Sequence, residues 1–177
     1  KPEQTISLFE KTVYENDFGT VGVVIRETSI VEVTPYRLEA KYTDFRHPDE
    51  VKFSDKLEDD LKRRDFTINA MALGSKGNLV DLYDGIKDIK NKTVRAVGEG
   101  DVRFKEDALR MLRAVRFSTE LNFSISHETT ESIIKNADLI KEISQERIHD
   151  EFVKIIMSPD PKKGMELMHE TGILKII

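Results

Sequence analysis

The sequence contains no cysteine, and this absence excludes several kinds of chemistry. Disulfide scaffolds, cysteine nucleophiles and zinc or iron–sulfur sites that depend on cysteine are all ruled out. The absence also fits a reducing compartment, so we expect a cytoplasmic location. No apolar run approaches the ~18–20 residues that cross a membrane, and we therefore expect no membrane partner.

Several well-known catalytic motifs are also missing. The chain has no phosphate loop of the GxxxxGK[ST] kind, no GxSxG elbow and no HExxH zinc motif. Its 177 residues are 38% hydrophobic and 34% charged, which is typical of one soluble domain or slightly more. A net charge of −5 argues against a generally basic nucleic-acid binder but leaves room for a local basic patch. The start at Lys1 and the apolar end at Ile177 predict a piece of a longer protein.

Apolar periodicity predicts strands mainly in the first part of the chain and helices after it. The expected helices are Pro2–Lys11, Phe66–Leu73, Phe104–Leu121, Glu128–Ala137, Ser144–Met157 and Lys162–Glu170, with another beginning after Ser54. The expected strands are Val21–Ile25, Ile30–Tyr36, Leu79–Leu82 and Thr93–Val97, and Leu38–Phe53 is expected to be a long loop. This order predicts an α+β fold, with one domain over residues 1–99 and a helical part over 100–177.

The first candidate cluster begins with two adjacent arginines, Arg63 and Arg64. Guanidinium groups suit phosphate oxygens because they offer several donors in a fixed fork. Asp65 and Asn69 follow at a spacing of four, which places them on one face if the segment is helical. They could hold a ribose hydroxyl or orient the arginines. The alternative is a solvated helix start, with Asp65 as an ordinary acid of the first turn.

The second cluster is a row of arginines, Arg110, Arg113 and Arg116, which recur every three residues with Asp107 at the start of the row. On a helix they form one slanted line beside a separate apolar face. Such a row on a largely buried helix is costly without a partner, and an anionic ligand is a natural one. The alternative is a set of ion pairs within and between helices.

Asp107 and Arg110 allow a more specific interpretation. Cytosine and adenine each present an amine donor beside a ring-nitrogen acceptor. A carboxylate can accept from the amine while an arginine donates to the ring nitrogen. Uracil and guanine present a carbonyl in place of the amine and would meet Asp107 acceptor to acceptor. This pair could therefore select C and A without a nucleic-acid template.

Glu32 lies between two valines in a strand pattern, on the face opposite to them. It could face a metal site. A surface glutamate on a strand is the alternative.

Five segments together resemble the bacterial class II tRNA nucleotidyltransferases, the CCA-adding enzymes, and their relatives the bacterial poly(A) polymerases. Leu61–Ala72 is similar to the family's sugar-recognition motif, Asp81–Asp88 to its hinge motif, and Glu106–Arg110 to its EDxxR base-selecting motif. Ser144–Ile148 with Glu151 resembles the following neck motif, and Tyr42–Pro48 resembles the flexible loop that helps the switch from C to A. The match runs through essentially the whole chain.

The resemblance implies the later part of a polymerase-β-like head over residues 1–99, followed by a helical neck and the start of a body over 100–177. It also implies template-independent transfer of CMP and AMP from CTP and ATP to the 3′ end of tRNA, with two Mg²⁺ ions at the reacting oxygens. By the same match, Arg64, Arg113 and Arg116 would contact phosphates or sugar. Asp107 and Arg110 would read the base, and Glu32 would be a catalytic carboxylate near the metals.

The chain departs from the family pattern at its first motif, a glycine-rich turn followed by an Asp-x-Asp pair. No Asp-x-Asp occurs in this sequence, so we expect the chain alone to be inactive. Asp17-Phe18 stands where the family usually has Lys-His, and Pro35 replaces a usual threonine. The alternatives are a poly(A) polymerase, an enzyme that adds only CC or only A, and a non-catalytic module that binds nucleotide or RNA.

Overall fold

A computed structural model describes residues 1–15, 19–26, 29–39 and 51–177, and these fall into two compact units. The first unit comprises the described residues up to 39 together with 51–60, and the second comprises 61–177. The predictions for Asp17-Phe18 and for Tyr42–Pro48 lie outside the described residues. No helix in the described part of the chain is long and apolar enough to span a membrane.

The first unit is built around an antiparallel sheet in the order β1–β2–β3. Its elements are α1 (Pro2–Leu8), β1 (Thr12–Glu15), β2 (Thr20–Arg26), β3 (Ser29–Val33), β4 (Arg37–Glu39) and β5 (Val51–Phe53). Val21 and Val23 of the central strand are buried, whereas β3 is exposed along its whole length. The two strands expected in this unit are present as β2 and β3, although β3 ends at Val33 and not at Tyr36. The expected first helix is shorter, because the chain turns into β1, a strand that was not predicted.

The long loop predicted over Leu38–Phe53 is wrong at its described ends. Leu38 pairs with Lys52 as part of the antiparallel ladder between β4 and β5, and the Ser54 N–H donates to the Tyr36 carbonyl at 2.8 Å. These strands are only three residues long, too short to show alternation in the sequence.

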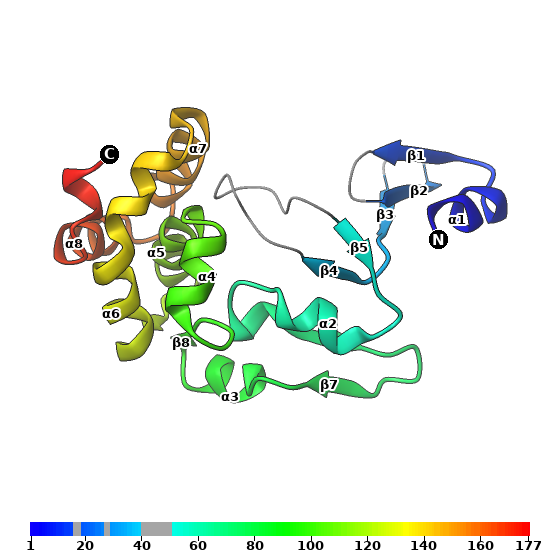
Figure 1. The fold of residues 1–177 in the computed structure, drawn as a ribbon, viewed down its shortest axis with the longest axis horizontal. Helices are drawn as coiled ribbons and strands as arrows, with labels where there is room; N and C mark the ends of the chain where they lie inside the picture. The colour runs from blue at the N-terminus through cyan, green and yellow to red at the C-terminus, as the bar shows by residue number, and fades with distance from the viewer. Residues whose placement is uncertain (16–18, 27–28, 40–50) are drawn as a thin grey trace. The chain divides into compact units, whose positions relative to one another are not determined.

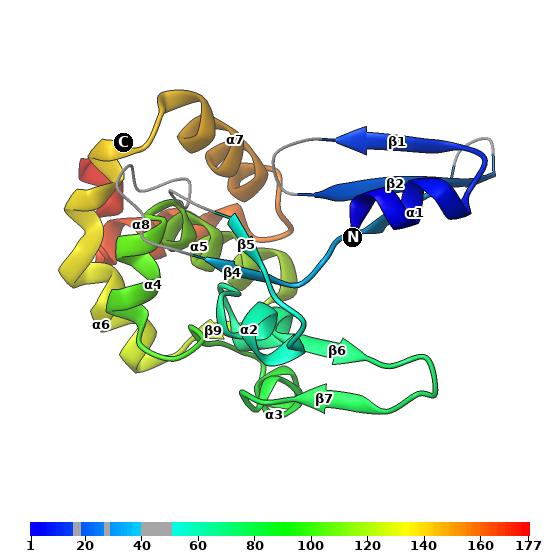
Figure 2. The same ribbon diagram turned by 45° about the vertical axis from the view of Figure 1, so that its right-hand side comes forward.

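The second unit is mainly helical (Figure 1). Its strands are β6 (Met71–Leu73), β7 (Leu79–Asp81), β8 (Thr93–Val94) and β9 (Ser124–Ile125). Its helices are α3 (Gly85–Lys90), α4 (Gly100–Glu106), α5 (Leu109–Leu121), α6 (His127–Asn136), α7 (Gln145–Ile156) and α8 (Pro161–Glu170), and α2 (Leu57–Lys62) begins in the first unit and ends here. Short 3-10 turns lie at Thr67–Asn69, Ala137–Glu142 and Ile173–Lys175. Figures 1 and 2 show α4 to α8 gathered together, with the β6–β7 hairpin extending beside α3.

Helix α5 lies at the centre of the helical core. Met111, Leu112 and Val115 are fully buried, and the helix packs against both α7 and α8. The same core includes Phe66 and Val94, which precede the expected domain boundary near Glu99. Because these side chains share one core with the helices, the compact unit begins near residue 61.

Two helix predictions are wrong, and the first concerns Phe66–Leu73. Phe66 is extended, Thr67–Asn69 forms a 3-10 turn, and Met71–Leu73 is a strand paired with β7. The turn is fixed by distant residues, since the Thr67 hydroxyl donates to Asp88 at 2.6 Å and the Thr67 N–H donates to the Arg95 carbonyl at 2.9 Å. Tertiary contacts of this kind override helical propensity.

The second error is the single helix predicted over Phe104–Leu121. The chain breaks between α4 and α5, where Asp107 is extended with φ −146° and ψ 104°. The Asp107 carboxylate accepts the Leu109 N–H at 3.1 Å, a local bond that aspartate offers in place of helix continuation. Asp107 therefore precedes the arginine row and is not part of its helix.

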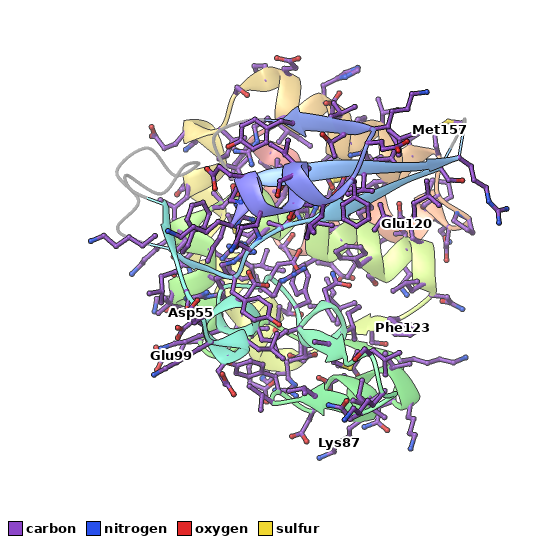
Figure 3. All side chains as sticks on the ribbon, turned by 90° about the vertical axis from the view of Figure 1, so that its right-hand side faces the viewer. Asp55, Lys87, Glu99, Glu120, Phe123 and Met157 are labelled. Carbon is purple, nitrogen blue, oxygen red and sulfur yellow. The ribbon has the colours of Figure 1, made fainter. Side chains whose placement is uncertain are left out.

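We predict that Gly85→Ala destabilises the protein. An added Cβ would lie 2.4 Å from the Thr67 carbonyl oxygen and 2.8 Å from the Met71 sulfur, so the 3-10 turn must move. Overpacking of this kind costs about 1–3 kcal/mol. Urea unfolding monitored by circular dichroism measures the loss. Lys87→Ala, at an exposed position of the same helix (Figure 3), is the control, and equal stability of the two variants would contradict the prediction.

We also predict that Asp81 stabilises the loop before α3 in a pH-dependent way. Desolvation would raise the pKa of Asp81, but the N–H groups of Ile86, Gly85 and Tyr83, aided by Arg95, hold it below its ordinary value. A lowered pKa gives stability that is present near neutral pH and is lost as the pH falls through the folded-state pKa.

Asp81→Asn should therefore be less stable than the parent protein at pH 7, and the two should converge as the pH falls below the ordinary Asp81 pKa of 3.8. Urea unfolding at a series of pH values tests this. Asp84→Asn, next to the same helix, is the matched control because the Asp84 side chain makes no capping bond. A difference between Asp81→Asn and the parent that does not change with pH would argue against the charge as its cause.

Candidate nucleotide-binding site

A hollow of about 490 Å³ lies within the second unit. It is lined by Arg63, Arg64, Asp65, Asn69, Asp107, Leu109, Arg110, Arg113 and Arg147. The segment before the 3-10 turn, the junction of α4 with α5, and α7 each contribute to it. The structure thus brings together both sequence clusters, except for Arg116, and adds Arg147 from a third element.

Asp65 is held entirely by the chain's own groups in this structure. Its Oδ2 accepts from Nε and Nη2 of Arg113 at 2.9 and 2.6 Å. Its Oδ1 accepts from the Phe66 N–H at 2.8 Å and from Asn69 Nδ2 at 3.3 Å. Asp65 and Asn69 do meet, as their spacing indicated, although through a 3-10 turn. The arginine that Asp65 contacts through these bonds is Arg113, and not one of the two adjacent arginines that precede it.

Arg113 is positioned on its other side by an aromatic pair. Its guanidinium carbon lies 5.3 Å from the centre of the Phe117 ring, and Phe117 meets Phe66 edge to face at 5.8 Å. The Arg113 side chain nevertheless stays 32% exposed where it lines the hollow. A fixed guanidinium with donors left toward an open site is suited to an anion.

Arg110 is more enclosed. Its Nη1 donates to Glu106 Oε2 at 2.8 Å and to the Arg103 carbonyl at 3.3 Å, and its Nη2 donates to the Arg63 carbonyl at 3.1 Å. Only 8% of the residue is exposed. The chain therefore fixes the plane of this guanidinium before any ligand is present.

Asp107 is held by a nearby backbone group and by a side chain of α7. Oδ1 accepts the Leu109 N–H, and Oδ2 accepts from Nη2 of Arg147 at 3.0 Å. Arg147 lies in the Ser144–Ile148 segment quoted above, but its place in the site was not predicted. The pattern of the α7 sequence alone contains no sign that this arginine reaches residue 107.

The lining residues give the hollow a positive character. Five arginines and two aspartates line it, and the arginines are Arg63, Arg64, Arg110, Arg113 and Arg147. A concave site with an excess of guanidinium groups and two well-held carboxylates can bind a polyphosphate while it presents hydrogen-bond acceptors to a neutral ring.

Arg116 does not line this hollow. It lies between α5 and α7, where its Nε is 3.3 Å from Glu151 Oε2 and its Nη1 donates to Glu151 Oε1 at 3.4 Å. Its guanidinium carbon lies 4.6 Å from the centre of the Phe117 ring. Its Nε also lies 3.7 Å from Oε2 of Glu120 (Figure 3). For this arginine the structure shows the alternative considered above, an ion pair between helices.

Glu32 lies in the first unit, on β3 opposite Gly22 of β2. It lines a small hollow of about 140 Å³. The flanking Val31 and Val33 are themselves exposed, so the strand does not separate a buried apolar face from a polar one.

No group of three histidine, aspartate or glutamate side chains that could hold a metal occurs in the described ranges. The role of Glu32 as a metal ligand stays a prediction.

Comparison with known proteins places the chain in a family. Residues 1–95 match the poly A polymerase head domain, and residues 122–177 match a family described as the probable RNA- and SrmB-binding site of polymerase A. A CCA-adding enzyme of Ligilactobacillus salivarius is 47% identical over 175 residues, which is 98% of this chain and 43% of that protein. The chain belongs to the poly A polymerase head domain family, and it spans less than half the length of the curated relatives it matches.

Solved structures confirm the expected fold class. The crystal structure of the Bacillus stearothermophilus CCA-adding enzyme in complex with CTP has a TM-score of 0.87 and 39% identity, over 97% of this chain and 41% of that one. A tRNA nucleotidyltransferase complexed with a primer tRNA and an incoming ATP analog has a TM-score of 0.78 and 30% identity, over 94% of this chain and 46% of that one.

We predict that Arg116→Met lowers stability and leaves nucleotide binding nearly unchanged. Among the described residues, the variant leaves the 4%-exposed Glu151 with Lys154 as its cationic partner. Breaking a buried pair from one side costs about 3–5 kcal/mol when the remaining charge has no partner, and we expect a smaller loss here because Lys154 remains. Urea unfolding measures the loss, and titration with CTP measures binding. A loss of CTP affinity without a loss of stability would instead assign Arg116 to the nucleotide.

Proposed function

We propose that this chain is the nucleotide-selecting part of a tRNA nucleotidyltransferase, which adds C and A to the 3′ end of tRNA from CTP and ATP without a template. The observation that carries the proposal is the hollow in which arginines surround Asp107 and Arg110. The similar structures that are complexed with CTP, and with a primer tRNA and an ATP analog, support it.

In the proposed complex the arginines bind the triphosphate, and among them Arg64 is exposed and Arg113 is partly exposed. The base lies against the wall formed by Asp107 and Arg110. Asp107 accepts a hydrogen bond from the exocyclic amine of cytosine or adenine, and Arg110 donates to the adjacent ring nitrogen. Asn69 keeps Asp65 in place, and Asp65 keeps Arg113 in place. Uracil and guanine are rejected because their carbonyl faces an acceptor.

The transfer reaction itself needs groups that the sequence lacks, since it contains no Asp-x-Asp pair. The chain alone is then expected to hold and select nucleotides without transferring them. The family generally uses a divalent metal, and we propose Mg²⁺ for the complete enzyme, with Glu32 as one carboxylate of that site. The substrates of tRNA maturation and the absence of cysteine favour the cytoplasm as its location.

A poly(A) polymerase is the second candidate function. The matching family is named for poly A polymerase, and the Asp107–Arg110 pair accepts adenine as well as cytosine. Because this pair accepts both bases, CTP binding is expected for either candidate, and incorporation by the complete enzyme distinguishes them. A CCA-adding enzyme transfers CMP to a tRNA that lacks its 3′ CCA, whereas a poly(A) polymerase transfers AMP alone.

Asp107→Ala should abolish base selection and leave phosphate binding largely intact. Isothermal titration of the chain with CTP, ATP, GTP and UTP in the presence of Mg²⁺ tests this. The parent chain should prefer CTP and ATP by about tenfold or more, the value of a good paired contact to a base edge. In the variant all four affinities should converge on that of GTP.

Asp138→Ala, at an exposed position in the same unit, is the control and should keep the preference. A selective Asp107→Ala variant would remove Asp107 from base recognition. Equal binding of all four nucleotides by the parent chain would contradict the proposed base-reading function.

A further inference from the structure

The local backbone around Asp107 does not by itself fix the orientation of the Asp107 carboxylate. Residue 107 is the non-helical link between α4 and α5, so no neighbouring helical turn restricts its side chain. The local N–H of Leu109 fixes Oδ1 alone. A carboxylate tied at one oxygen can still rotate about the bond to its Cβ, because this terminal torsion is broad.

The second tie comes from Arg147 on a different helix. Its Nη2 lies 3.0 Å from Asp107 Oδ2, across 40 residues of sequence. Helix α7 is firmly anchored: Ile148 and Ile155 are in the core, and Glu151 pairs with Arg116 of α5. The backbone position of Arg147 is thereby set by packing that does not depend on Asp107.

The placement of Arg147 also lowers the stability of the folded state. Its Nη1 is buried and has no hydrogen-bond partner among the described residues. A buried donor without a partner disfavours the folded state by roughly 1–3 kcal/mol, and native structures keep few of them. The contact with Asp107 is the hydrogen bond that the side chain makes in the described part of the structure. Such a placement indicates a role in the site more than a role in stability.

Resting on the proposed function, we propose that Arg147 is a positioning residue for base selection that acts through Asp107. With both carboxylate oxygens tied, the remaining lone pairs keep one direction toward the hollow. A base with an amine at that point is accepted, and a base with a carbonyl is repelled. Without Arg147 the carboxylate can turn away from the carbonyl of uracil or guanine, so the penalty against these bases falls.

The competing role is a direct contact between Arg147 and the phosphates, since Arg147 lines the hollow together with the other arginines. The two roles differ in what they change. A phosphate contact contributes equally to every nucleoside triphosphate and to inorganic triphosphate. A positioning contact changes the ratio of affinities between bases and leaves inorganic triphosphate unaffected.

The test is isothermal titration of the parent chain, Arg147→Met, Arg147→Lys, Asp107→Ala and the double variant Arg147→Met/Asp107→Ala. Each is titrated with CTP, UTP and inorganic triphosphate. We expect Arg147→Met to lower the ratio of CTP to UTP affinity by about tenfold, which is ~1.4 kcal/mol. Its affinity for inorganic triphosphate should stay within about twofold, which is ~0.4 kcal/mol. The double variant should be no less selective than Asp107→Ala, because Arg147 acts through that residue.

Arg147→Lys keeps the charge and a donor, and it should recover part of the selectivity. Lys154→Met is the matched control, since Lys154 lies two turns further along α7 and pairs with Glu151 outside the hollow. Urea unfolding of each variant separates loss of fold from loss of selectivity. If Arg147→Met proves unfolded, Arg147→Ala, which likewise removes the donor, is titrated instead, and full parental selectivity with that variant overturns the proposal.

Other outcomes are equally distinct. Equal losses for CTP, UTP and inorganic triphosphate would assign Arg147 to the phosphates and overturn its positioning role. A third outcome is that the parent chain and Arg147→Met are both selective whereas Asp107→Ala is not. This result would overturn the inference about Arg147 and leave the proposed function unchanged. A parent chain that does not distinguish CTP from UTP would overturn both.

Discussion

The ion pair between Asp65 and Arg113 joins two stretches of chain that are 48 residues apart, and the wall of the hollow proposed to bind nucleotide depends on this junction. One stretch follows α2 and the other is the central helix of the core. The carboxylate takes both Nε and Nη2 of the arginine, and the same residue also holds the start of the 3-10 turn through the Phe66 N–H. A charge pair with this geometry fixes direction as well as distance, because a guanidinium is planar.

Arg113 and Arg116 show how little the sequence pattern says about the use of a side chain. They are three residues apart on one helix, and the row of arginines predicts the same environment for both. Their partners differ: Arg113 meets Asp65 beside the hollow, whereas Arg116 meets Glu151 on α7. Both guanidinium groups lie near the Phe117 ring, and one of them faces the hollow whereas the other lies between helices.

The parts of the fold that follow from local physics could be predicted from the sequence. Helices α6, α7 and α8 have amphipathic periodicity, and serine, serine and aspartate precede them as N-caps. The 3-10 turn at Thr67 could not be predicted, because its partners Asp88 and Arg95 are distant in sequence. The break at Asp107 is hidden by the apolar pattern that continues on both sides of it. Six of the predicted site residues lie together, and Arg147 was missed since only tertiary packing brings α7 to the α4–α5 junction.

The shared core of the second unit determines how the hollow forms on folding and is lost on unfolding. Phe66 and Val94, from the part of the chain matched by the head family, are buried in one cluster with Leu112, Ile133 and Ile155. Elements that share a single core usually open as one cooperative segment. The elements that line the hollow are therefore expected to unfold together, so an opening of the native state that releases α7 also removes the hollow. The hollow, and with it the nucleotide binding that we propose, therefore depends on the folding of the whole helical unit.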